Sequence, residues 1–383
     1  RYTRLTYNHE EGKISKLSES SDDDEIEEQV KWLSYRQHFF SSILATETPF
    51  DSASLASRNL VEEESKETRF TKEYTTETTL PLMAGELASS LYWYYGPTDV
   101  KVLKNYKELG LVDSIPFGWG IFGWINRQVF TPFYEFLSSF LPFGIAIVVM
   151  TILVRLLMSP VTYKSYLSQA KMKVLKPEIT ELNEKYKDNA MKRQQATMKL
   201  YNKAGVSPMS GCVPALLQLP IFYALFMFFP TSFALRQKSF LWAEDLSSYD
   251  TILELPFTIP FYGDHVSLFP ILASVAIFFY MMMTTGQNMQ TQPGMPNMKV
   301  IMYISPLLML FFFNNYASGL SLYYFVSNLI TIFIMLAIKN FILDQDKIHA
   351  QIEEKKKQPK KENRFQRKMR EMMEQAEEQK KKR

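Results

Sequence analysis

Long apolar runs, nearly free of charged residues, alternate with charged blocks from residue 140 onward. A helix needs about 20 mostly apolar residues to cross the hydrocarbon core of a bilayer. Five runs reach or approach this length: residues 140–158, 212–235, 266–283, 300–313 and 320–338. A buried helix of a soluble protein can also be apolar on every side, but five such runs close together disfavour that alternative. The pattern therefore predicts five membrane-spanning helices, the last two forming a helical hairpin.

The first 110 residues follow a different pattern, with a period of two. Residues 1–7 and 69–79 alternate Thr, Tyr and Phe with polar residues, and an aromatic run at 91–95 precedes a Gly-Pro turn. Short alternating runs of this kind predict β-strands. Two acidic, Ser-rich stretches, 18–28 and 62–67, indicate surface loops. We expect a β-rich domain without catalytic function.

Polar helical segments flank the first predicted span. Residues 121–140 mix aromatic side chains with polar ones, which predicts a helix lying flat in the membrane interface. On the other side of the span, residues 162–187 and 190–204 are rich in Lys, Glu and Gln and lack glycine. They predict an antiparallel helical hairpin, with Pro177 bending or breaking its first arm. Its basic charge suits either a solvated face or a docking surface, and the sequence favours neither.

Charge divides the chain into blocks that predict an orientation. The mean hydropathy of −0.14 hides this division because it averages over the whole chain. The net charge is −8 in residues 1–116 and +6 in each of 161–206 and 339–383. Lys and Arg accumulate in short loops on the cytoplasmic side of membrane proteins. The loop 236–265 holds only two basic residues against five acidic ones. We therefore expect both basic blocks in the cytoplasm, with residues 1–139 and the loop 236–265 outside.

The sequence contains no constellation typical of an enzyme. The single cysteine, Cys212, cannot form an intrachain disulfide, and the four histidines show no metal-ligand spacing. The phosphate-binding, dinucleotide-binding, zinc-protease and nucleophile-elbow motifs are all missing. No pair of carboxylates falls within a predicted span, which disfavours an intramembrane protease and a proton-driven pump. We expect no catalytic residue, no cofactor and no metal.

One charged residue, Arg155, falls inside a predicted span. A cation at the bilayer centre costs at least about 2.5–3.5 kcal/mol and is a functional hypothesis by default. Arg155 also precedes Pro160 by five residues, which puts it about 7–8 Å from the expected inner end of the helix. Extension of the side chain to the inner headgroups is therefore an equal alternative. Thr151 lies four residues earlier, on the same helical face.

Polar residues also mark the second and fifth predicted spans. Ser321, Tyr324, Asn328 and Thr331 are spaced by three or four residues and form one stripe, and Gln218 lies within the second span. Such residues either bond neighbouring helices or line a cavity. Together with the intramembrane arginine they favour a hydrated groove open to the cytoplasm. Water and a fixed positive charge there would lower the cost of moving a polar or acidic segment into the membrane.

Several local motifs, taken in order, resemble those of one known family. They are Ile147–Pro160 with its Arg155, Gln169-Ala170-Lys171-Met172, Leu175-Lys176-Pro177, Tyr201-Asn202-Lys203, Ser207-Pro208, Gly211-Cys212, Gln218-Leu219-Pro220-Ile221-Phe222, Ser318-Gly319-Leu320, Leu322-Tyr323-Tyr324 and Ser327-Asn328-Leu329. Residues 117–345 thereby resemble the YidC membrane protein insertases, relatives of the mitochondrial Oxa and chloroplast Alb insertases. The upstream part resembles the end of the large periplasmic domain of Gram-negative members.

The resemblance implies an α-helical polytopic membrane protein. It combines a five-helix insertase core and a cytoplasmic helical hairpin with the C-terminal part of a periplasmic β-supersandwich domain. The implied parts are a periplasmic β-rich domain (1–116), an interfacial amphipathic helix (117–139), a membrane core (140–345, with spans at about 140–160, 212–235, 266–284, 299–315 and 319–341 and the hairpin at 161–206) and a basic cytoplasmic tail (346–383). It further implies that a membrane anchor and the first part of the periplasmic domain precede residue 1.

The resemblance also implies roles for individual residues. A substrate groove would include Arg155, which engages the incoming segment, together with Thr151, Gln218, Tyr324 and Asn328, and apolar contacts to the substrate would come from Ile221, Phe222 and Phe312. The hairpin would receive targeting factors, and the basic tail would attract ribosomal RNA through its charge.

The expected function is that of a membrane protein insertase and chaperone in the bacterial inner membrane, and not that of an enzyme. Its partners would be nascent membrane proteins, the ribosome, the Sec translocon, targeting factors and the phospholipid bilayer. Two alternatives stay open. One is a small-solute transporter or channel that uses Arg155 as an anion site, although the sequence shows no repeat of two halves. The other is an assembly factor that only binds folded membrane subunits.

Overall fold

The chain forms two compact units, each with buried apolar clusters of its own. The computed structural model describes residues 2–60, 70–80, 82, 85–87, 89–187, 189–206, 213–285, 298–342 and 345–357. The first unit comprises Arg1–Leu153, Gln218–Ile277 and Pro306–Asn328, and the second comprises Val154–Leu217, Phe278–Ser305 and Leu329–Arg383.

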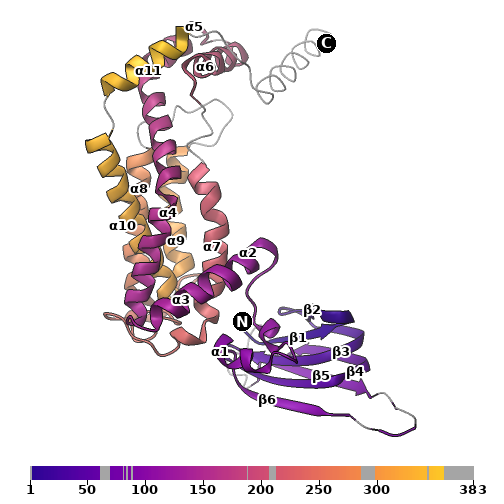
Figure 1. The fold of residues 1–383 in the computed structure, drawn as a ribbon. Coiled ribbons are helices and arrows are strands. Elements are labelled where there is room, and N and C mark those ends of the chain that lie inside the picture. The colour runs from indigo at the N-terminus through magenta and orange to yellow at the C-terminus, as the bar shows by residue number, and fades with distance from the viewer. Residues whose placement is uncertain are drawn as a thin grey trace, which may run out of the picture. The chain divides into compact units, whose positions relative to one another are not determined.

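A six-stranded antiparallel sheet opens the first unit (Figure 1). Its strands are β1 (Arg4–His9), β2 (Lys13–Lys16), β3 (Asp23–Gln37), β4 (Phe40–Asn59), β5 (Lys72–Thr79) and β6 (Leu91–Pro97). The order is β2-β1-β3-β4-β5, and β6 also pairs with β4. Because β4 is 20 residues long, its second half pairs with β5 and its first half with β6. The predicted β-rich first part is confirmed.

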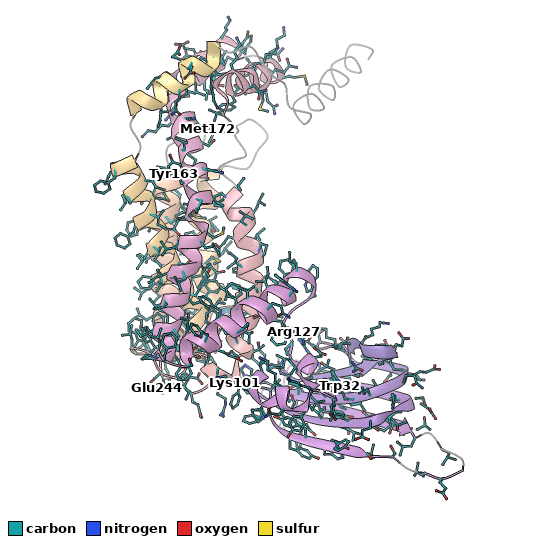
Figure 2. The ribbon with its side chains drawn as sticks, in the orientation of Figure 1. Trp32, Lys101, Arg127, Tyr163, Met172 and Glu244 are labelled. Atoms are coloured by element: carbon teal, nitrogen blue, oxygen red, sulfur yellow. The ribbon has the colours of Figure 1, made fainter. Side chains whose placement is uncertain are left out.

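The sheet buries side chains on both of its faces. Leu33 and Phe50 belong to the cluster on one face, while Trp32, the residue before Leu33 in β3, packs on the other (Figure 2). Successive residues of a strand point to opposite faces, so this alternation follows from the extended backbone. Leu103 and Leu111, from the short helices after β6, cover the Trp32 face. Each face therefore buries an apolar cluster of its own.

The acidic stretch 18–28 is a strand from Asp23 onward, so the prediction of a surface loop is wrong there. The first residues of β3 pair with the end of β4. Asp24 forms an ion pair with Arg58 of β4, with 2.7 Å between Oδ1 and Nη1. Backbone pairing with a distant segment overrides the local charge pattern, because exposed carboxylates on an extended strand remain solvated. The other acidic stretch, 62–67, lies outside the described residues.

Helices dominate the rest of the chain, with one additional β-hairpin (Figure 1). The α- and π-helices are α1 (Val100–Leu103), α2 (Gly120–Ile125), η4 (Asn126–Phe130), α3 (Thr131–Ser138), α4 (Phe143–Val174), α5 (Lys176–Lys185), α6 (Ala190–Ala204), α7 (Val213–Thr231), α8 (Leu268–Thr285), α9 (Met298–Phe313), α10 (Ser318–Ala337), η7 (Ile338–Ile342) and α11 (Gln345–Lys357). Short 3-10 turns are η1 (Glu10–Gly12), η2 (Lys104–Tyr106), η3 (Leu111–Ser114) and η6 (Phe233–Leu235), and the hairpin consists of β7 (Thr251–Ile259) and β8 (Gly263–Ser267).

The long helices carry apolar side chains on their outer surfaces. By length and composition, Phe143–Val174 and Ser318–Phe341 are sufficient to cross a membrane, and shorter apolar helices lie at Leu216–Thr231, Leu268–Met283 and Tyr303–Phe313. Leu157 of α4, Leu219 of α7 and Leu308 of α9 are all exposed. Exposed apolar surface of this kind suits contact with lipid rather than with water. The predicted helical part with apolar helices is confirmed.

Helix α4 continues through Pro160, where the sequence predicted that it would end. It runs from Phe143 to Val174 and breaks only at Leu175, and Pro177 then lies in the first turn of α5. A proline removes one backbone hydrogen bond and kinks a helix, but it need not stop one whose following residues favour helix. The hydroxyl of Thr162, two residues after the proline, donates to the Met158 carbonyl in the same turn.

A buried asparagine joins the β7–β8 hairpin to the turn between α9 and α10. The Asn314 side chain is fully buried, and its amide nitrogen donates to the carbonyls of Tyr262 and His265, at 2.9 Å each. Its amide oxygen accepts from the Ser267 backbone N–H at 3.0 Å. In return, His265 Nε2 lies 3.0 Å from the Asn314 carbonyl. These four residues are called the Asn314 joint below.

Asp250 provides a second polar anchor beside this joint. Its Oδ2 accepts from the backbone N–H groups of Leu268 and Phe269, at 3.0 and 2.8 Å, and from the Trp242 indole at 2.8 Å. A carboxylate at this place satisfies the first donors of α8 and complements the positive end of its dipole. Burial raises the pKa of Asp250, and the hydrogen bonds from Phe269, Trp242 and Leu268 oppose that shift.

The Asn314 joint generates a first prediction. Asn314→Ala removes three buried hydrogen bonds and leaves their backbone partners unsatisfied, at about 1–3 kcal/mol for each group that finds no replacement. We expect the free energy of unfolding to fall by at least about 2 kcal/mol, measured by thermal or denaturant unfolding of the purified protein in detergent. The neighbouring Asn315→Ala removes one hydrogen bond, to the Tyr262 carbonyl, from a half-buried position and is the matched control. Equal losses for the two variants would contradict the role given to Asn314.

Candidate functional site

Aromatic side chains from α7, α9 and α10 form one cluster in the first unit. The rings of Phe222 and Tyr324 lie 5.6 Å apart between centroids, and those of Phe226 and Phe312 lie 5.8 Å apart. Tyr316 stacks on Phe312 at 4.8 Å and contacts Phe226 at 4.9 Å. Ring pairs at these separations add attraction to the burial of their surfaces. The structure thus brings together three residues that the sequence analysis assigned to the substrate path: Phe222, Phe312 and Tyr324.

Two of the polar candidates are satisfied within their own helices. The hydroxyl of Thr151 is buried and donates to the Ile147 carbonyl at 2.7 Å. Asn328 is also buried, and its Nδ2 donates to the Tyr324 carbonyl at 2.7 Å. In both cases the acceptor lies four residues earlier, as is common for such side chains in apolar helices. Both residues are therefore compatible with an apolar surrounding.

Three other buried polar atoms lack a hydrogen-bond partner among the residues that the structure describes. They are Gln218 Nε2 on α7, and Ser321 Oγ and the Tyr323 hydroxyl on α10. An unsatisfied buried donor costs about 1–3 kcal/mol. Native proteins rarely tolerate such atoms unless water or a bound partner satisfies them. Both helices also contribute to the aromatic cluster, so polar and apolar candidates share the same elements. Ile221, the remaining apolar candidate, is half-buried on α7.

Arg155 belongs to the second unit, whereas the other seven candidates belong to the first. It is half-buried on α4, and Tyr280 of α8 lies within electrostatic reach of its guanidinium. The expectation that Arg155 lies 7–8 Å from the inner end of its helix is wrong. Since α4 ends at Val174, it extends about 28 Å beyond Arg155 at 1.5 Å per residue. The end of the helix therefore does not mark the membrane surface for this side chain.

The cytoplasmic hairpin candidate has a third helix packed onto it. Ile348 and Ile352 of α11 are buried against Leu175 and Ile179, in a cluster that also contains Ala204 and Val206. The ammonium of Lys356 lies 2.7 Å from Glu178 Oε1. Burial disfavours the charge on Lys356, but hydrogen bonds to Glu178 and Glu353 outweigh this effect and raise its pKa.

Sequence reasoning missed this docking, because it treated the tail as a separate basic segment. The available signal was the pair Ile348 and Ile352, which are four residues apart and therefore share one face of a highly charged helix. The tail residues Phe365, Met369, Met372 and Ala376 show a similar spacing, but they lie outside the described residues.

Comparison with known families accounts for nearly the whole chain. The model of the family described as "60Kd inner membrane protein" matches residues 133–347, and that of the "YidC periplasmic domain" matches residues 1–132. The chain belongs to the 60 kDa inner membrane protein family. The first of these matches covers more than half of the chain, and the second assigns the β-rich part to a known periplasmic domain.

Individual relatives share the name "Membrane protein insertase YidC". The protein of Parabacteroides distasonis is 42% identical over 97% of this chain and 60% of its own length. That of Phocaeicola vulgatus is 42% identical over 88% and 56%, and that of Porphyromonas gingivalis is 37% identical over 98% and 62%. A crystal structure described as an active YidC insertase aligns at 20% identity with a TM-score of 0.43, too low to support an argument.

Family membership sets the cellular context of the site. This member of the 60 kDa family is an inner-membrane protein with a periplasmic segment. The chain spans about 60% of the length of the curated relatives that it matches. In those helices of an inner-membrane protein that lie in lipid, unsatisfied polar atoms are costly.

Substitution of Gln218 tests whether its side-chain amide forms a hydrogen bond in the protein without substrate. Gln218→Leu replaces a buried amide with an apolar side chain of similar size, so we expect unfolding stability to stay constant or to rise by about 1 kcal/mol. Thr151→Val is the matched control, because it deletes a hydroxyl that has an acceptor and should lower stability by about 0.5–1.5 kcal/mol. Thermal unfolding in detergent measures both variants. A larger loss for Gln218→Leu than for Thr151→Val would show that the amide is bonded.

The packing of α11 generates a separate prediction. Ile352→Ser exposes the hairpin cluster, so α11 should detach while the rest of the protein stays folded. We expect amide hydrogen exchange within Gln345–Lys357 to accelerate at least tenfold in protein held in lipid nanodiscs. His349→Ser, at an exposed position of the same helix, should leave exchange nearly unchanged. Unaltered exchange in Ile352→Ser would mean that α11 is held by something other than this cluster.

Proposed function

We propose that this chain is the membrane-inserting part of an insertase and chaperone, and not an enzyme. It would move hydrophobic segments of new proteins from the cytoplasm into the inner membrane, alone or with the Sec translocon. Membership in the 60 kDa inner membrane protein family supports this proposal, as do relatives named membrane protein insertase. Because the chain spans about 60% of those relatives, the activity is assigned to the helices that it contains.

The observation that carries the mechanism is the cation on α4. Arg155 follows the buried Thr151 by one helical turn, within a helix otherwise composed of apolar residues at this level. A fixed positive charge inside the membrane attracts a carboxylate more strongly than it would in water, because the local dielectric constant is low. For an acidic segment on its way to the periplasm, this attraction would offset part of the free energy that desolvation of its carboxylates costs. No chemical step or cofactor is needed for this effect.

Polar atoms on α7 and α10 would serve the same path. Gln218, Tyr324 and Asn328 are assigned, with Arg155 and Thr151, to a hydrated groove open to the cytoplasm. This assignment rests on the sequence motifs that these residues share with insertases. The amide nitrogen of Gln218, which has no hydrogen-bond partner among the described residues, supports it, because water or the backbone of a passing substrate would satisfy that donor.

Apolar residues beside the groove would receive the hydrophobic part of the substrate. Phe222 and Phe312 belong to the aromatic cluster, Ile221 precedes Phe222 on α7, and nearly half of the Phe312 side chain is exposed. A transmembrane segment that slides along such a face exchanges water for apolar contacts and then for lipid. The energy for insertion would come from this transfer, at about 25 cal/mol per Å² of apolar surface.

The remaining assignments concern topology and partners. We propose five spans with a cytoplasmic C-terminus, and the division into a periplasmic domain (1–116), an interfacial helix (117–139), a membrane core (140–345) and a tail (346–383). The hairpin (161–206) and the tail are the two strongly basic parts of the chain, and their Lys and Arg side chains would attract ribosomal RNA and targeting factors at low salt. Nascent membrane proteins are the proposed substrates.

The decisive experiment reconstitutes the protein into liposomes with short single-span substrates that carry either an acidic or a neutral N-terminal tail. We expect Arg155→Ala to lower insertion of the acidic-tailed substrate about tenfold, and that of the neutral-tailed substrate much less. Arg155→Lys retains the charge and should retain most of the activity. Protease protection of the translocated tail measures insertion.

Arg127→Ala provides the control for this experiment. Arg127 pairs with Asp113 at 2.5 Å and lies outside the predicted spans, so its loss should not alter the preference for acidic tails. Insertion by the wild type no better than in empty liposomes would refute the insertase proposal. Equal insertion of acidic tails by Arg155→Ala and wild type would refute only the role of the charge.

A further inference from the structure

The β7–β8 hairpin exposes an unusual amount of apolar surface for a segment outside the helices. Its exposed side chains include Leu253 (57%), Phe257 (61%) and Phe261 (94%). Residues 255–263 carry no charge, and the only charged residues of the whole hairpin are Glu254 and Asp264. A water-exposed loop normally shows the opposite composition.

The hairpin also lacks the support that a sheet in water requires. β7 and β8 form a two-stranded sheet, with no third strand among the described residues. Such a hairpin is at best marginally stable in water unless its apolar sides are covered. At the tip, Phe261 has a left-handed backbone (φ 67°), a conformation that costs a non-glycine residue roughly 1–2 kcal/mol. The Phe261 side chain is nevertheless almost fully exposed.

The turn of the hairpin and its second strand are fixed to the end of a membrane helix. Asn314 binds the carbonyls of Tyr262 and His265, and Asn315 binds the Tyr262 carbonyl at 2.8 Å. The Tyr262 ring packs edge-on against Phe311 of α9 at 5.3 Å. Helix α8 begins at Leu268, the residue directly after β8. The exposed apolar tip is therefore held rigidly at the end of helices whose own surfaces face lipid.

We propose that the β7–β8 hairpin inserts its apolar tip, centred on Phe257 and Phe261, among the acyl chains of the outer leaflet. The lipid-facing surface of α8 and α9 would thereby continue onto the hairpin. The absence of Lys and Arg from residues 251–267 makes attraction to anionic headgroups an unsuitable source of binding. Burial of apolar side chains is the driving force, so the contact should not depend on lipid charge or on salt.

This inference rests on the proposed topology, which puts the hairpin at the periplasmic end of the core, but it does not depend on the insertase activity. It assigns to the loop between α7 and α8 a lipid-binding role. Rigid attachment through the Asn314 joint would fix the depth of α8, α9 and α10 relative to the outer leaflet.

Single-cysteine variants test the depth of the tip. On a Cys212→Ser background, Phe257→Cys and Phe261→Cys are labelled with the environment-sensitive fluorophore NBD and reconstituted into vesicles that contain nitroxide-labelled acyl chains. Glu244→Cys, at an exposed position of the same loop (Figure 2), is the matched control. We expect blue-shifted emission at 257 and 261, and at least threefold stronger nitroxide quenching than at 244. The values should be equal in zwitterionic and anionic vesicles.

Two results would overturn the proposal. Emission and quenching at 261 equal to those at 244 would place the tip in water. Protection that requires a high protein-to-lipid ratio, with disulfide-linked dimers through position 261, would assign the surface to a second copy of the chain. A second measurement avoids the fluorophore. Phe261→Cys without NBD, in vesicles, should react with a membrane-impermeant maleimide at least tenfold more slowly than Glu244→Cys. Equal reaction rates would also refute insertion.

Discussion

The helical part of this protein depends on how polar groups are satisfied at the ends of its apolar helices. The Asn314 amide holds the β8 strand and the residues at the tip of the hairpin, while Asp250 accepts the first backbone donors of α8. Neither water nor lipid can replace these bonds at a buried site, so each loss leaves an unsatisfied group. The start of α8, the turn before α10 and the orientation of the β7–β8 hairpin all follow from these two side chains.

The interior of the helices shows the opposite arrangement, because polar groups there lower the stability of the folded protein. Gln218 leaves a buried donor without a described partner, and Arg155 places a charge in an apolar helix. A protein optimised only for stability would carry apolar residues at both positions. Under the proposed function, both groups would interact with a substrate segment as it enters the membrane. Thr151 and Asn328 differ, because carbonyls of their own helices accept their hydrogen bonds and their burial therefore costs little.

Comparison of the predicted and observed elements shows which signals were reliable. Alternating Thr, Tyr and Phe correctly indicated β1 and β5, and the aromatic run before the Gly-Pro turn correctly indicated β6. The acidic start of β3, in contrast, was assigned to a loop. Pro160 was taken as a helix end, although α4 continues beyond it. Both errors come from treating a local preference as decisive when pairing with β4, or helix-forming residues on both sides, outweighed it. The β7–β8 hairpin escaped prediction because it is mostly apolar and lacks a clear alternation. Ile348 and Ile352 were visible as a pair, but their partners were not.

The sequence by itself determined the class of the protein. Long apolar runs decide which segments can enter a bilayer and blocks of like charge decide their orientation, and both are local properties of the chain. The sequence also singled out Arg155, since a charge within an apolar run needs no neighbour to be conspicuous. Only the tertiary structure decided which polar atoms are satisfied, which aromatic rings meet and where the C-terminal helix packs. Those outcomes depend on contacts such as Phe222 with Tyr324, or Ile352 with Ile179, between residues more than a hundred positions apart. No periodicity along the chain encodes such pairings, because each follows from the packing of whole elements.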